Sequence, residues 1–174
     1  MRILYLLFLI TTAIFGANLN YVIKEDLIKQ RMYKEFPIVK ETMLLTFRIS
    51  DPRLTLDGAR QRFHIKARLQ IPNIRDDKGK VVSAVLTFSS RIAYSKGGDL
   101  YLRKIKTENI QSEFIGESMK SMLYGTIDQA INEYFKSRPV YSLKDEKGLV
   151  GMAVKSIKNV IIVDDGLKVI FNMG

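Results

Sequence analysis

The clearest pattern in the chain is a strict alternation of apolar and polar residues over positions 63–71. Phe63, Ile65 and Leu69 belong to the apolar set, and cationic residues such as Arg62 and Lys66 fill positions between them. Successive side chains of a strand point to opposite faces, so this segment has one apolar and one cationic face. We predict a strand over residues 61–73, about twice the usual length of five to six residues.

Three more segments alternate in the same way, over residues 42–56, over residues 81–94 and from Leu100 onward. Turn-forming residues separate them at positions 57–58, 76–79 and 97–98. Short turns force consecutive strands to pair, which predicts a four-stranded antiparallel meander. Pro52 indicates an edge position or a bulge in the first strand, and the shift of the pattern to Ile105 indicates a bulge in the last.

The period changes after the meander. Residues 113–137 carry apolar side chains at spacings of three and four, which predicts a long amphipathic helix with Ser112 as its N-cap. Pro139 lies just beyond its end. The helix would be roughly 36 Å long and the long strand roughly 43 Å, so one can lie along the other and cover it.

The remaining segments are shorter. Residues 24–36 predict a helix that Pro37 stops, with an extended stub at 21–23 before it. An extended piece at 140–143, a short helix at 149–155 and a hairpin made of residues 160–163 and 167–173 close the chain. The pattern therefore predicts an α+β fold, a β-meander against one long helix with a shorter N-terminal helix and a C-terminal hairpin.

The N-terminal segment is typical of an export signal. Arg2 precedes an apolar run over residues 3–17, which is short for a membrane span but suits a secretory signal. We expect residues 1–17 to be a signal peptide or an uncleaved N-terminal anchor, and residues 18–174 to form a single domain. In a bacterium this indicates the periplasm. The chain has no cysteine, so packing alone must stabilise it.

The chain carries a net charge of +10, spread along its length. A basic surface attracts polyanions, and for an exported protein anionic lipid headgroups are available rather than nucleic acid. No nucleic-acid-binding motif is present in the sequence. We therefore expect no nucleic-acid partner and consider an anionic membrane surface, with a basic surface that has no partner as the alternative.

The sequence offers little for catalysis. His64 is the only histidine, and without cysteine or a second histidine it lacks partners for a metal site or a catalytic dyad. The paired carboxylates at 76–77 and 164–165 fall in predicted turns, where aspartate bonds backbone amides. We therefore predict that the protein is not an enzyme and has no catalytic residue, metal or cofactor.

The methionines allow two interpretations. Unbranched and polarisable side chains line adaptable apolar cavities, and they equally fill gaps in a packed core. Periodicity does not report volume, so both interpretations stay open for the following residues: Met43, Met119, Met122, Met152 and Met173.

Three segments resemble, in order, the YceB-type bacterial envelope lipoprotein family, a domain family of unknown function. They are YVIKEDLI at 21–28, DLYLRKI at 99–105 and YFKSRPVYSL at 134–143. That family looks like a remote relative of the tubular lipid-binding (TULIP) superfamily, which implies a strongly curved antiparallel sheet wrapped around a long helix, with lipid chains between them. The family's lipidated cysteine is absent here, so the resemblance implies a periplasmic protein without a lipid anchor, either free or held by its N-terminus.

Pattern and resemblance together lead to one expected function, the non-enzymatic binding of a lipid or other apolar ligand in a groove between the long helix and the curved sheet. The expected lining is Phe63, Ile65, Leu69, Leu86, Phe88, Met119, Leu123, Ile127 and Ile131. Arg62, Lys66 and Arg68 would face outward toward anionic headgroups. The main alternative is a periplasmic interaction or scaffold protein with a filled core and no ligand. The sequence indicates no oligomeric state.

Overall fold

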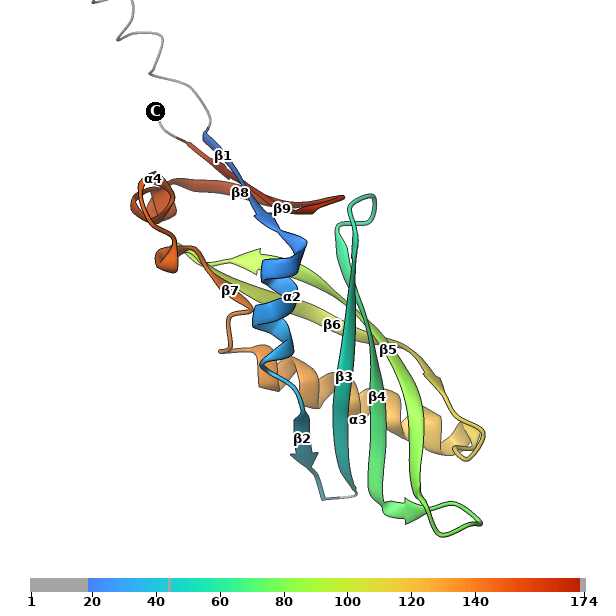
Figure 1. The fold of residues 1–174 in the computed structure, drawn as a ribbon. Helices are drawn as coiled ribbons and strands as arrows, with labels where there is room; N and C mark the ends of the chain where they lie inside the picture. The colour runs from blue at the N-terminus through green and yellow to red at the C-terminus, as the bar shows by residue number, and fades with distance from the viewer. Residues whose placement is uncertain (1–18, 44, 173–174) are drawn as a thin grey trace, which may run out of the picture.

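The computed structural model describes residues 19–43 and 45–172, which form a mixed α+β fold with two antiparallel sheets (Figure 1). The larger sheet has the strand order β2-β3-β4-β5-β6-β7. The predicted meander forms its centre, and β5 and β6 bend away from β3 and β4 in Figure 1. Its strands are β2 (Ile38–Glu41), β3 (Thr46–Asp57), β4 (Arg62–Arg75), β5 (Val81–Tyr94), β6 (Asp99–Gln111) and β7 (Tyr141–Ser142).

The smaller sheet joins the two ends of the described chain. Its strand order is β1-β9-β8, with β1 at Leu19–Lys24, β8 at Ile157–Val163 and β9 at Gly166–Phe171. The C-terminal hairpin is therefore confirmed as a hairpin, and the extended stub is confirmed as a strand. Their pairing was not predicted, because it depends on contacts across nearly the whole chain. The close approach of Gly166 allows it, since a Cβ there would lie 2.0 Å from the carbonyl oxygen of Ile23.

Both predicted bulges are present. The register of β3 against β4 shifts between Ser50 and Arg53, around Pro52, and Asp51 has a positive φ of 53°. The register of β5 against β6 shifts next to Lys104, which has a φ of 52°. An extra residue in one strand leaves backbone groups without a ladder partner, so each bulge creates a place where another element can bond the strand.

The long helix is shorter than predicted. The structure has α3 at Glu117–Phe135, and its N-cap residue is Gly116 rather than Ser112. The Ser112 hydroxyl instead donates to the carbonyl oxygen of Ser83 and accepts from the amide of Phe114, which holds residues 112–116 in a turn. Nineteen residues give about 28 Å of helix, whereas the 14 residues of β4 give about 46 Å. The predicted match of lengths was therefore wrong.

The smaller helices lie close to where the pattern placed them. They are α2 (Glu25–Tyr33), α4 (Leu149–Met152) and the 3-10 turns η1 (Leu143–Asp145) and η2 (Ala153–Ser156). The sequence pattern missed β2, which pairs with β3 through Ile38 to Glu41. It also misplaced Met43, which falls within the strand predicted over residues 42–56 but lies in the β2–β3 turn with its side chain fully exposed.

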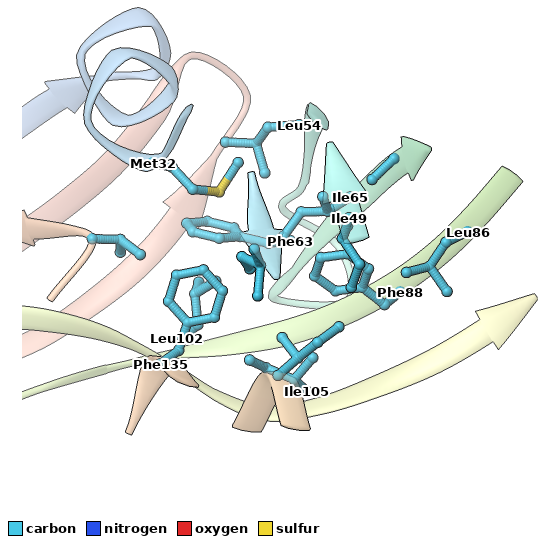
Figure 2. Close-up of a cluster of buried hydrophobic side chains, with 14 of the residues drawn as sticks. Met32, Ile49, Leu54, Phe63, Ile65, Leu86, Phe88, Leu102, Ile105 and Phe135 are labelled. Carbon is cyan, nitrogen blue, oxygen red and sulfur yellow. The ribbon is translucent and has the colours of Figure 1, made fainter. Parts of the chain in front are cut away.

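The core lies between the concave face of the large sheet and the helices. Figure 2 shows Phe63 of the sheet next to Met32 of α2 and Phe135 of α3, with Ile65 and Phe88 in the same cluster beside Ile49. The alternating set predicted for β4 is buried throughout. No helix of the described residues is long and apolar enough to cross a membrane, and the predicted export segment, residues 1–17, lies outside them, as does Met173.

Candidate functional site

The structure brings the predicted groove residues together in one buried cluster. Phe63, Ile65 and Leu69 come from β4, Leu86 and Phe88 from β5, and Leu123, Ile127 and Ile131 from α3. All eight have a relative exposure of 0%. Met119 is partly buried and packs against the same cluster. In the structure these side chains pack against one another, and the hollows described below are lined by other residues.

One side of α3 is fixed to the sheet by hydrogen bonds to backbone. The Asn132 side chain donates to the carbonyl oxygen of Ile105 at 2.7 Å and accepts from the amide of the same residue at 3.1 Å. The Asp128 carboxylate accepts from the amide of Thr107. The β7 strand pairs with β6 only at Asp99 and Leu100. Side chains of α3 therefore take the place of a neighbouring strand at Ile105 and Thr107, where they satisfy backbone groups of this edge.

The C-terminal end of α3 is held from the same strand. The Arg103 guanidinium donates to the carbonyl oxygen of Phe135 at 3.2 Å and to that of Lys136 at 3.0 Å. These carbonyls end the helix and have no partner within it, so a cation there also complements the helix dipole. The sequence pattern did not identify this use of Arg103, Asp128 and Asn132, because it depends on the position of α3 against the bulge in β6.

Hollows lie on both sides of α3. One of about 490 Å³ borders β6 at Leu102 and Arg103. The other, of about 600 Å³, lies between α3 and β2, and we call it the seam pocket. Its lining comes from β2, the β2–β3 turn and α3, and comprises Lys40, Glu41, Thr42, Met43, Thr126, Gln129, Ala130 and Glu133. Ala130 is 4% exposed and belongs to the buried core, so the floor of the pocket adjoins the core directly. The volume falls within the range of about 300–1,000 Å³ that is usual for small-molecule sites.

One end of the seam pocket is closed by polar contacts. Lys40 Nζ lies 3.3 Å from Glu133 Oε2, with both side chains partly exposed. Beside it, the Tyr134 hydroxyl donates to the carbonyl oxygen of Glu35 at 3.0 Å. Burial and the nearby Glu35 carboxylate raise the pKa of Tyr134, against the opposing effect of Arg138. Met43 in the lining is fully exposed, and exposed Met122 lies one helical turn before Thr126.

Only part of this pocket could be expected from the sequence. Met43 was named as a candidate for lining a cavity, and the structure places it in the lining. The residues from β2 were missed because that strand has four residues and pairs with β3 through Thr46 to Ile49 only. The sequence signal was Pro37, which ends the helix and leaves a short extended piece before the β2–β3 turn.

His64 lies on the outer face of the sheet between two carboxylates. Its Nδ1 is 3.2 Å from Glu108 Oε2, and its Nε2 is 3.5 Å from Asp57 Oδ2. The amide of Arg60, with the charges of Arg60 and His64 nearby, holds the pKa of Asp57 below its usual value. Within residues 19–43 and 45–172, no group of three or more histidine, cysteine or acidic residues is arranged to hold a metal ion.

The outward-facing cations predicted from the alternation are in place. Lys66 and Arg68 are exposed on the outer face, and half-buried Arg62 donates to Ser89 Oγ at 3.0 Å. Arg53, Lys66 and Arg68 border a shallow hollow of about 410 Å³ between β3, β4 and β5. Asp51 in its rim lies 3.5 Å from Arg68 and offsets part of the charge.

A comparison with known families covers most of this architecture. Residues 23–166, from β1 to the start of β9, match the family described as "Protein of unknown function (DUF1439)". The chain belongs to the DUF1439 family. No curated protein matches the chain. Every residue of the seam pocket and of the α3–β6 contact lies inside the matched range, so both features belong to the DUF1439 domain.

Proposed function

We propose that this DUF1439 protein binds a lipid acyl chain or a similar apolar ligand and catalyses no reaction on it. The observation that carries the proposal is the unequal attachment of α3. On the β6 side, Asn132 and Asp128 bond the strand's backbone. On the β2 side, the ion pair of Lys40 and Glu133 joins the strand to the helix, beside a pocket of about 600 Å³.

This arrangement suits a lid that is hinged on one edge. Lifting α3 from β2 breaks a partly exposed ion pair, which is worth at most about 1 kcal/mol, and the bond from Tyr134 to Glu35, and it uncovers apolar side chains beside Ala130 that a bound acyl chain would cover again. Lifting α3 from β6 leaves buried backbone groups without hydrogen-bond partners, which costs about 1–3 kcal/mol for each group. The helix therefore opens at the seam pocket first, and an apolar chain entering over Ala130 reaches Ile127 and Ile131. The nine predicted lining residues are then the surface that such a ligand would meet.

The wider setting agrees with this proposal. A long helix against a bent antiparallel sheet is the arrangement that the resemblance to the tubular lipid-binding superfamily implies, and the apolar N-terminal run is typical of an exported protein. We place the protein in the periplasm, either free or held by its N-terminus. No residue is given a role in making or breaking bonds.

A second function has its own support. Eight of the nine predicted lining residues have a relative exposure of 0% without any ligand. A core this well filled suits an envelope interaction or scaffold protein that carries no ligand. The two functions differ in whether an acyl chain enters beside Ala130, and this can be measured directly.

The first experiment measures uptake of cis-parinaric acid, a fluorescent 18-carbon fatty acid, by the purified protein. We expect saturable binding by the wild type. Thr126→Trp fills the seam pocket from α3 and should abolish uptake while leaving the free energy of unfolding within about 1 kcal/mol. Ser121→Trp, on an exposed position of the same helix outside the pocket lining, is the matched control and should bind normally.

The second experiment tests the lid. The chain has no cysteine, so the double variant Lys40→Cys/Glu133→Cys has two unique thiols across the seam. Linking them with a short, thiol-cleavable bis-maleimide should block uptake of the fatty acid, and cleaving the linker should restore it. Absence of uptake by the wild type would favour the scaffold function. Unchanged uptake by the linked protein would exclude entry at this seam.

A further inference from the structure

A second surface, separate from the seam pocket, combines exposed apolar side chains with cations. Leu149 and Met152 of α4 have relative exposures of 64% and 73%. Exposed Lys147, Lys155 and Lys158 surround them in the sequence and have no ion-pair partner among the described residues. We call these five residues the α4 tip. Isolated exposed apolar residues are common. Packing does not explain why two of them lie between lysines that have no ion-pair partner among the described residues.

The α4 tip is held firmly to the domain. Ala153 is buried and Val150 and Val154 pack against the core, so the inner side of this segment is anchored. Gly151 lies against the backbone of η1, where a Cβ would be 2.2 Å from the carbonyl oxygen of Glu146. Leu149 and Met152 are therefore presented outward by a fixed scaffold.

The acidic residues near the tip already have ion-pair or hydrogen-bond partners within the domain. Asp145 pairs with Arg31 of α2 at 3.0 Å, and Asp99 pairs with Lys144 at 2.8 Å. Glu146 accepts from the hydroxyls of Tyr21 and Tyr141. Asp145 and Asp99 are thus paired with cations of the domain, and Glu146 is held toward its interior by two hydroxyls, whereas the three lysines of the tip have no ion-pair partner among the described residues.

The tip lies at the same end of the molecule as the start of β1. Leu19 pairs with Phe171, which in turn pairs with Ile157, the residue that directly follows η2. Figure 1 shows the chain entering β1 at this end, near α4 and away from the β4–β5 turn. Leu19, the first described residue, therefore lies at the same end of the domain as Leu149 and Met152.

We infer that the α4 tip docks on an anionic lipid bilayer, with Leu149 and Met152 entering the interface and Lys147, Lys155 and Lys158 meeting the headgroups. Amphipathic surfaces of this kind bind through buried apolar area together with attraction to anionic lipid. Each lysine near such a surface contributes about a fivefold increase in binding. The inference does not depend on ligand uptake at the seam pocket.

The chain has no tryptophan, so a single substitution gives a local optical probe in the intact protein. The Leu149→Trp variant is mixed with phosphatidylglycerol vesicles whose acyl chains are brominated. We expect a blue shift of its emission and strong quenching, and much weaker quenching with phosphatidylcholine. Val85→Trp, at an exposed position on the outer face of β5 beside the Arg53–Lys66–Arg68 hollow, is the control and should not be quenched.

The lysines are tested in the same background. Lys147→Gln/Lys155→Gln should lower the ratio of docked to undocked protein about 25-fold. Lys78→Gln/Lys80→Gln makes the same charge change in the β4–β5 turn and should leave the ratio unchanged. Quenching at Val85→Trp but not Leu149→Trp, equal quenching by phosphatidylcholine, or a blue shift that grows with protein concentration without vesicles would each overturn the inference. The last result would indicate self-association.

Discussion

Replacing Asn132 with alanine tests whether α3 is anchored on the free edge of β6. The Asn132 side chain bonds both the amide and the carbonyl oxygen of Ile105, beside the bulge at Lys104. It also donates to the carbonyl oxygen of Asp128 within the helix. Alanine keeps the helix and removes all three bonds, so the peptide groups of Ile105 lose their partners.

The expected loss follows from these contacts. A backbone group left buried without a partner costs about 1–3 kcal/mol. Asn132 is half-buried, so water can reach part of the site, and alanine is the better helix former by about 0.5 kcal/mol. We therefore expect the free energy of unfolding to fall by about 1.5–3 kcal/mol. For a domain of this size, that lowers Tm by about 3–10 °C.

Urea unfolding followed by circular dichroism measures this change, with the slope m expected to stay constant. Gln129→Ala is the matched control, because Gln129 is exposed on the same helix and faces the seam pocket. The control should change the free energy of unfolding by less than about 0.5 kcal/mol. If Asn132→Ala changes the free energy of unfolding as little as the control does, α3 does not depend on its bonds at the bulge for anchoring.

Three further outcomes are expected. Gly166→Ala should lower the free energy of unfolding by roughly 2–4 kcal/mol in the same urea assay, because its Cβ would lie 2.0 Å from a carbonyl oxygen of β1. Gly125→Ala in α3, where the Cβ meets open space, should raise the free energy of unfolding by about 0.5–1 kcal/mol. Burial and the Glu146 carboxylate raise the pKa of Tyr141 above its usual 10.0, so stability should fall as the pH rises above 10. The decrease of stability with pH should be less steep in Tyr141→Phe, and an equal decrease would refute this. Burial of Asp99 opposes its ionisation, but bonds from Lys144 and Ser142 hold its pKa below 3.8. The free energy of unfolding should therefore fall as the pH drops below that value, as measured by pH-dependent thermal melts. Lys144→Met should make this loss of stability in acid smaller.

The alternating segments predicted the centre of the large sheet closely. The third strand was predicted at its observed bounds, Val81–Tyr94, and the bulges near Pro52 and Lys104 were read from a proline and a slipped pattern. These features are local, because the side-chain period and the turn residues that fix them lie next to one another in the chain. The start of α3 was wrong because the Ser112 hydroxyl bonds Ser83 on another strand.

The candidate site depends much more on the tertiary structure. The sequence placed Met43 among possible cavity residues but also within the strand predicted over residues 42–56, whereas its exposed position in the β2–β3 turn puts it at the seam pocket. Nothing in the pattern paired Lys40 with Glu133, which are far apart in the chain. Nor could periodicity distinguish a filled core from an open groove, because it reports which face a side chain occupies and not the volume around it.

By itself, the sequence determined the α+β class, the antiparallel meander, the buried face of each long strand and the cationic outer face, because alternation and turn chemistry act between near neighbours. Only the tertiary structure decided how α3 sits on the sheet. A bulge in β6 left backbone groups that Asn132 and Asp128 bond, whereas Glu133 meets β2 through the side chain of Lys40. Hydrogen bonds to backbone need a specific position in space, and that position fixes one side of the helix and leaves the seam pocket beside the other.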